Sequence, residues 1–175
     1  MPHVTSLSPG SFDVRETIYG FVPLSTNEMI PDISTTVLQI EAGSSGLAFL
    51  LGRVLFGAVL AFMGLNHFMN VDSMTGYSEA KGIPMPRLSV VFSGGMLLFG
   101  GLGIAIGAFP ALSAGAIALF LIVSTPTMHD FWAAPEEQQQ SEMTNFLKNV
   151  ALLGGALVFL ALSGNTWPYA VGLGI

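Results

Sequence analysis

Residues 46–66 read GLAFLLGRVLFGAVLAFMGLN, a run in which Arg53 is the only ionisable side chain. A helix needs about 20 mainly apolar residues to cross the hydrocarbon layer of a bilayer. Three further runs meet this requirement, at residues 88–107, 111–132 and 145–163. They are continuously apolar, and only helices or closed barrels satisfy their backbone groups in lipid. The sequence therefore predicts an all-α integral membrane protein, an antiparallel up-down four-helix bundle.

The composition points to lipid as the surroundings of the chain. Hydrophobic residues make up 51% and charged residues only 9% of the sequence, and the mean hydropathy is +0.67. Soluble domains carry roughly 25% charged residues, so this chain has too few charges for a water-facing surface. We expect a multi-pass protein of the cell membrane. The net charge of −6 and the lack of a basic patch exclude nucleic acid as an expected partner.

Residues 1–45 differ from the remainder of the chain. They are rich in proline and in carboxylates, which outnumber the single basic residue Arg15: Asp13, Glu16, Glu28, Asp32 and Glu41. Such a composition is typical of irregular structure. We expect an acidic, mostly irregular N-terminal tail over residues 1–45 and a transmembrane domain over residues 46–175.

The ionisable groups after residue 45 gather on one side of the predicted membrane domain. With four crossings, the connections after the first and third helices lie on the same side, and only Arg53 lies toward the other. Lys81, Arg87 and Lys148 belong to the crowded side. By the positive-inside rule this side is expected to be cytoplasmic, with both termini outside.

Polar residues occur where the first and third helices end and the fourth begins. Pro126 loosens the third helix there, because it cannot donate a hydrogen bond to the carbonyl of Ile122. We expect a polar pocket at the depth of a ligand headgroup, formed by Asn66, His67, Thr125, His129, Asp130, Lys148 and Asn149. The alternative is that these residues meet only water and lipid headgroups. Neither HxxxH nor ExxH spacing occurs, so no metal site is predicted.

Two basic residues lie within apolar runs and need an explanation. Lys148 sits in the opening turns of a helix, where the helix dipole disfavours a cation. It is expected to extend to the interface or to pair with Asp130 or Glu142. The alternative is that it binds an anion or a polar headgroup. Arg53 is interpreted as an anchor whose charged end reaches the interface. Three aromatic residues are interpreted as interfacial belt residues, namely Trp132, Trp167 and Tyr169.

Several motifs in a fixed order resemble the DoxX family of small membrane proteins. They are GRVLFGAVLAFMGLNHF (52–68), GIPMP (82–86), MHDFW (128–132) and NFLKNVALLGGAL (145–157), and the resemblance covers about residues 46–165. It implies a four-helix membrane bundle and a connection to quinone-linked thiosulfate oxidation and to thiol and redox-stress enzymes. Several relatives carry an acidic residue in the second helix, where this chain has SGGMLLFGG (93–101). Because cysteine is absent, sulfur chemistry would have to occur on a partner.

Three functions fit these observations. The first is a non-catalytic anchor or scaffold subunit that docks a soluble or membrane oxidoreductase partner. The docking segment would be the acidic connection after the third helix, AAPEEQQQSEMT (133–144). The second is a quinone-interacting subunit of a membrane redox complex, in which His129, Asn66 or Asn149 would bond the quinone headgroup. The third is a small transporter, for which four helices with short loops offer little cavity unless the protein forms a homo-oligomer.

Overall fold

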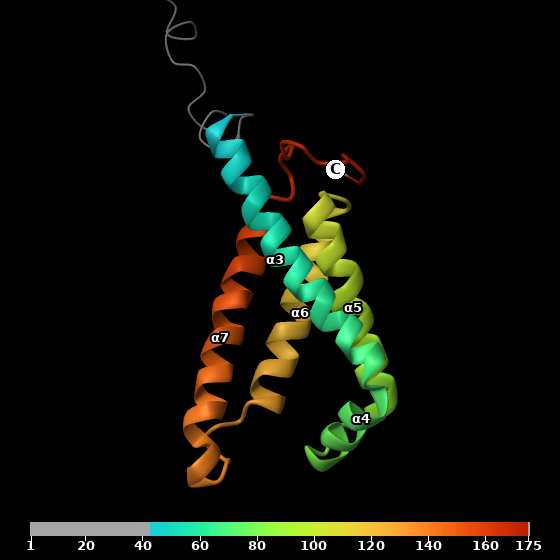
Figure 1. Ribbon diagram of the computed structural model, residues 1–175, viewed down its shortest axis with the longest axis vertical. Coiled ribbons are helices and arrows are strands. Elements are labelled where there is room, and N and C mark those ends of the chain that lie inside the picture. The colour runs from blue at the N-terminus through green and yellow to red at the C-terminus, as the bar shows by residue number, and fades with distance from the viewer. Residues whose placement is uncertain (1–42, 175) are drawn as a thin grey trace, which may run out of the picture. The chain divides into compact units, whose positions relative to one another are not determined.

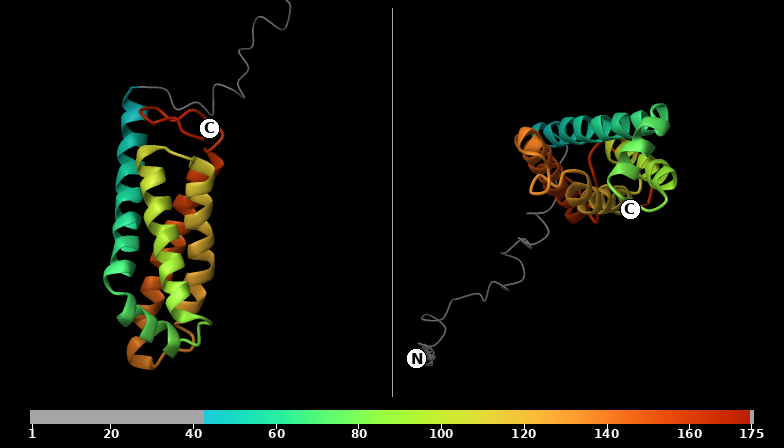
Figure 2. Two further views of the ribbon diagram at one scale, coloured as in Figure 1. Left: turned by 90° about the vertical axis from the view of Figure 1, so that its right-hand side faces the viewer. Right: turned by 90° about the horizontal axis from the view of Figure 1, so that it is seen from below.

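The computed structural model describes residues 43–174, and residues 1–42 of the predicted tail lie outside this range. Four helices in it are long and apolar enough to cross a membrane (Figure 1). They are α3 (Ser44–Met69), α5 (Pro86–Ile106), α6 (Pro110–Met128) and α7 (Glu136–Ala161). Along the bundle α3 packs beside α5, α5 beside α6, and α6 beside α7 (Figure 2). The prediction of an all-α membrane bundle is confirmed.

The structure corrects the predicted helix ends at the crowded side. The third helix ends at Met128 rather than at residue 132, and the fourth begins at Glu136 rather than at residue 145. Pro135 precedes the first turn of α7, and Glu136 and Glu137 occupy that turn. The helix dipole favours anions there, so this polar sequence forms helix beyond the apolar run. The hydropathy pattern predicted only the apolar part of this helix and missed the polar turns before residue 145.

The connection between the first two crossings contains a short helix of its own. This helix, α4, spans Val71–Ala80 and lies against α5. Ser78 is its buried residue. Lys81 follows directly, and Gly82 continues in the left-handed conformation at φ 71°. The short helix carries Tyr77 and Lys81 toward the end of α6.

Glycines bring the backbones of α3 and α5 into direct contact. A Cβ atom on Gly101 would lie 2.5 Å from the backbone nitrogen of Ala61, and one on Gly64 would lie 2.7 Å from the carbonyl oxygen of Gly94. Real Cβ atoms essentially never approach other atoms so closely. Small residues allow such contacts between membrane helices. They fix how α3 lies on α5.

The C-terminal segment, residues 162–174, folds back over the end of the bundle opposite α4 (Figure 2). The amide of Phe109 donates to the carbonyl of Leu173 at 2.7 Å, and the amide of Val171 donates to that of Ile106 at 3.0 Å. These bonds attach the segment to the turn between α5 and α6. The segment thus covers the side chains below it.

Trp167 is a core residue, so its assignment to the interfacial belt was wrong. Its side chain is 2% exposed and packs against Phe49 and Phe159, with ring centroids at 5.3 and 5.7 Å. The folding back of the C-terminal segment puts the ring inside. Trp132 and Tyr169 are exposed.

Arg53 is also misassigned by the sequence, because it does not extend to the interface. Its side chain is fully buried. Its Nη2 donates to the carbonyl oxygen of Tyr169, and its guanidinium lies 5.9 Å from the ring of Trp167. The C-terminal segment supplies the polar partner that was expected from the membrane surface.

Candidate functional site

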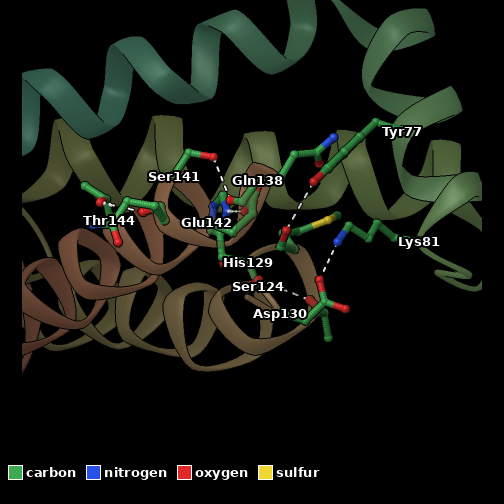
Figure 3. A network of polar contacts seen from close by, with 12 residues as sticks. Tyr77, Lys81, Ser124, His129, Asp130, Gln138, Ser141, Glu142 and Thr144 are labelled. Atoms are coloured by element: carbon green, nitrogen blue, oxygen red, sulfur yellow. Dashed lines mark hydrogen bonds and ion pairs between the residues drawn. The ribbon is translucent and has the colours of Figure 1, made fainter. Parts of the chain in front are cut away.

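Polar side chains from three helices meet at the end of the bundle where α4 lies (Figure 3). We call Tyr77, Lys81, His129, Asp130 and Glu142 the loop-end cluster. Tyr77 and Lys81 come from α4 and its end, His129 and Asp130 from the end of α6, and Glu142 from α7. The cluster therefore joins parts of the chain that are far apart in sequence.

His129 bonds across to α7. Its Nδ1 lies 2.8 Å from Oε2 of Glu142. The two side chains are 25% and 19% exposed, so both are largely covered. His129 is the C-terminal cap of α6, with φ −121° and ψ 49°, and this departure from helical geometry turns the chain toward α7. The imidazole therefore faces the neighbouring helix.

Asp130 bonds in the other direction, to the end of α4. Its carboxylate forms an ion pair with Nζ of Lys81. The hydrogen bond from Lys81 holds the pKa of Asp130 below its ordinary value. The same bond raises the pKa of Lys81. Both groups are therefore charged throughout the neutral pH range.

Tyr77 adds a second bond between α4 and α6, because its hydroxyl donates to the carbonyl oxygen of Met128 at 3.1 Å. The connection from α6 to α7 is held by aromatic rings. Phe131 and Trp132 pack against Phe146 of α7, with centroids at 5.5 and 5.9 Å. The connection from α6 to α7, which carries part of the loop-end cluster, is thus held by α4 on one side and by α7 on the other.

Two hydroxyl groups near His129 have no hydrogen-bond partner in the part of the chain that the structure describes. They are Oγ of Ser124 and Oγ1 of Thr125, both buried atoms. Thr125 precedes His129 by one helical turn, on the same face of α6. The nearby hydroxyl of Thr127 instead bonds to the carbonyls of Val123 and Ser124, at 2.9 and 3.1 Å. Buried hydroxyls without partners are uncommon in folded proteins.

The predicted residues from the first helix make bonds within their own part of the chain. The amide oxygen of Asn66 accepts from Nδ2 of Asn70 at 2.7 Å, and Asn66 is exposed. Nδ1 of His67 lies 2.9 Å from the carbonyl oxygen of Met63, and its ring meets Phe120 of α6 edge-on at 6.3 Å. His67 therefore turns toward the bundle, and Asn66 does not.

Lys148 has neither of the carboxylate partners considered for it. Asp130 pairs with Lys81, and Glu142 bonds to His129. Lys148 is exposed, and the structure gives it no hydrogen bond or ion pair within residues 43–174. Asn149 is partly buried.

The structure brings together only part of the predicted pocket. His129 and Asp130 join the loop-end cluster, and Thr125 is buried one turn away. A cavity of about 470 Å³ lies instead at the corner of α3 and α4, lined by residues 68–73 and Arg87. Another, of about 320 Å³, lies along α5 and α6. None of the predicted pocket residues lines either cavity.

Sequence reasoning missed Tyr77 and Lys81 as members of the site. Both lie in the connection between the first two crossings, for which the hydropathy pattern indicated no helix. The spacing of four residues between them was a usable signal, because it places both on one face of a helix. Within residues 43–174 no group of three His, Asp or Glu side chains is arranged to hold a metal ion.

The comparison with known families places this fold. A family model described as DoxX matches residues 48–130. This part of the chain is similar to the DoxX family. The part matched by the DoxX model runs from α3 to Asp130 and so includes Tyr77, Lys81 and His129. Glu142 and the C-terminal segment lie beyond it.

A curated DoxX-family relative covers more of the chain. The chain is 26% identical over 124 residues to inner membrane protein YphA of Escherichia coli (strain K12). The aligned residues cover 71% of this chain and 86% of the relative. No solved structure matches the chain. With four apolar helices and similarity to an inner membrane protein, the chain is a multi-pass membrane protein.

Proposed function

We propose that this protein is a non-catalytic membrane anchor or scaffold that docks a partner at the end carrying the loop-end cluster. The observation that carries the proposal is the bonding of α4, α6 and α7 to one another through Lys81–Asp130 and His129–Glu142. Because these segments are already held together, few of their side chains and loops have to be ordered when a partner binds. The entropic cost of association is therefore small.

The start of α7 supplies the surface itself. Glu136, Glu137 and Gln138–Gln140 are exposed, and the first two carry negative charge. Such a surface favours a partner with a basic patch and speeds their encounter. The partner class we propose is a soluble or membrane oxidoreductase, which rests on the resemblance of the sequence to redox-associated relatives.

Site-directed cross-linking in native membranes tests this proposal. The chain has no cysteine, so a single cysteine at Gln140, which is exposed, can carry a photoreactive group. A matched cysteine at Gly164, also exposed, reports the other end of the bundle. We expect a discrete partner adduct from position 140 only, and less of it when Glu136 and Glu137 are changed to glutamine.

Equal adducts from both positions, or no loss on removal of the two charges, would argue against docking at this end. Mass spectrometry of the adduct identifies the partner. A partner without a basic surface would also contradict the proposal.

A quinone-interacting role is the second candidate, and the unpartnered hydroxyls of Ser124 and Thr125 favour it. A quinone carbonyl could accept a hydrogen bond from such a hydroxyl. Retention of quinone after purification in mild detergent, measured by mass spectrometry of the lipid extract, tests it. Thr125→Val should reduce retention, and Thr127→Val should not, because the hydroxyl of Thr127 already bonds to its own helix.

A further inference from the structure

Arg53 presents an unusual environment at the end of the bundle opposite the loop-end cluster. The side chain is 0% exposed. Within residues 43–174, Nη2 donates to the carbonyl of Tyr169, whereas Nε and Nη1 have no hydrogen-bond partner. A guanidinium carries its charge at all physiological pH values. The structure thus buries a cation with most of its donors unused.

No carboxylate among the described side chains balances this charge. The acidic residues between positions 43 and 174 all lie in α4, in the connection after α6, or in the first turns of α7: Asp72, Glu79, Asp130, Glu136, Glu137 and Glu142. The end of α5 at Gly107 offers only the partial negative charge of a helix C-terminus. A buried charge without a partner is strongly unfavourable.

The surroundings of Arg53 form a cradle for the guanidinium. A Cβ atom on Gly107 would collide with Nη1 and with Ala170, so the absence of a side chain there makes room for the cation. The ring of Trp167 lies 5.9 Å from the guanidinium carbon. Tyr169, which supplies the carbonyl, has φ 57°, a conformation that costs free energy for a residue other than glycine. The C-terminal segment thus covers Arg53 with a strained backbone at Tyr169.

We propose that Arg53 binds a phosphate group beneath the C-terminal segment, with Nε and Nη1 as donors. Guanidinium and phosphate match in charge and in the geometry of their hydrogen bonds. The site lies where α5 ends and α6 begins, at the boundary of the membrane-spanning helices. Phosphate reaches that depth either as the free anion or as the headgroup of a phospholipid. Entry requires the C-terminal segment to shift, and Trp167 reports that shift.

The fluorescence of Trp167 provides the test. The full-length protein with Trp132→Phe retains Trp167 as its only tryptophan, since the sequence has two. Purified, delipidated protein in a neutral detergent is titrated with inorganic phosphate, and sodium chloride at equal ionic strength is the control. A second titration uses mixed micelles with phosphatidylglycerol, compared with diacylglycerol, which has the same acyl chains and no phosphate. We expect a saturable change in Trp167 emission together with a higher melting temperature.

The variants separate binding from a structural role. Arg53→Gln removes the charge and should abolish the response, while Arg53→Lys should raise the half-saturating concentration severalfold because it loses the planar fork. Arg87→Gln, an exposed arginine at the other end, should respond as the parent does. If Arg53→Gln does not fold, Arg53→Lys still provides the comparison.

The pattern of responses identifies the source of the phosphate. A response to inorganic phosphate supports a site for the free anion, and a response to phosphatidylglycerol alone supports a lipid site. An absence of response in both titrations, or an equal response in the parent and both Arg53 variants, would overturn the proposal.

Discussion

Nδ1 of His129 at the end of α6 lies 2.8 Å from Oε2 of Glu142 in α7. The next residue, Asp130, pairs with Lys81 beyond α4. Two adjacent side chains thus bond to two different helices. The chain that leaves α6 is therefore attached to α4 on one side and to α7 on the other.

Loss of the His129–Glu142 bond should destabilise the protein. Glu142→Gln is expected to lower the free energy of unfolding by about 1 kcal/mol, because both groups are largely covered. Thermal unfolding in detergent measures this, and a double-mutant cycle with His129→Asn isolates the coupling. Lys148→Met, an exposed change on the same helix, is the control and should have no effect. Additive single effects would contradict a direct bond.

The Lys81–Asp130 pair should make stability depend on pH at both extremes. The pKa of Asp130 is lowered, so its contribution is present above about pH 4 and is lost as the pH falls through the folded value. The pKa of Lys81 is raised, so its contribution is present below about pH 10 and is lost as the pH rises through the folded value.

Melting temperatures of the parent and Asp130→Asn across this range check the pH prediction. Their difference should be largest between about pH 4 and pH 10 and should shrink on either side. Asp72→Asn breaks the exposed pair with Arg87 and should change little at any pH, because exposed pairs contribute little. A constant difference between the parent and Asp130→Asn at all pH values would mean that Asp130 acts without its charge.

The glycine contacts between α3 and α5 predict opposite outcomes for similar substitutions. Gly64→Ala would force a Cβ atom against the backbone of α5 and should cost about 1–3 kcal/mol of stability. Gly95→Ala meets nothing within 4 Å and should leave stability unchanged or slightly raised. Thermal unfolding of both variants tests this, and equal losses would place the helix contact elsewhere.

Membrane topology can be measured directly, because the chain has no native cysteine. Single cysteines at Ser73, Ser141 and Gly164 occupy exposed positions, the first two at the loop-end side. The positive-inside rule predicts that an impermeant reagent added to intact cells labels position 164 only. Labelling of positions 73 and 141, without position 164, would reverse the orientation.

The fold was predictable as far as hydropathy determines it. The apolar runs around Arg53 and after Leu88 are each long enough to cross a membrane, and the structure has the helices α3 and α5 there. The start of α7 at Glu136 was missed because hydropathy marks only the part in lipid, although Pro135 and the two carboxylates after it are a signal for a helix start. The position of Trp167 was not visible either, because it depends on a chain reversal after α7 that no periodicity encodes.

The candidate site was predictable as a location more than as a set of partners. Topology placed His129, Asp130 and the start of α7 at one end, and they lie there. Which carboxylate pairs with which basic side chain depends on the distances between them in the folded protein. Lys81 reached Asp130 because α4 turned it toward α6, whereas Lys148 remained exposed.

The C-terminal segment has a consequence for how the protein is made. Synthesis runs from the N-terminus, so Arg53 enters the bilayer with α3 before Trp167 and Tyr169 have been translated. During that interval the guanidinium lacks the carbonyl and the ring that later cover it. An uncovered arginine in a membrane helix draws in water or lipid headgroups. The nascent helix therefore carries an open polar defect until residues 162–174 fold over it.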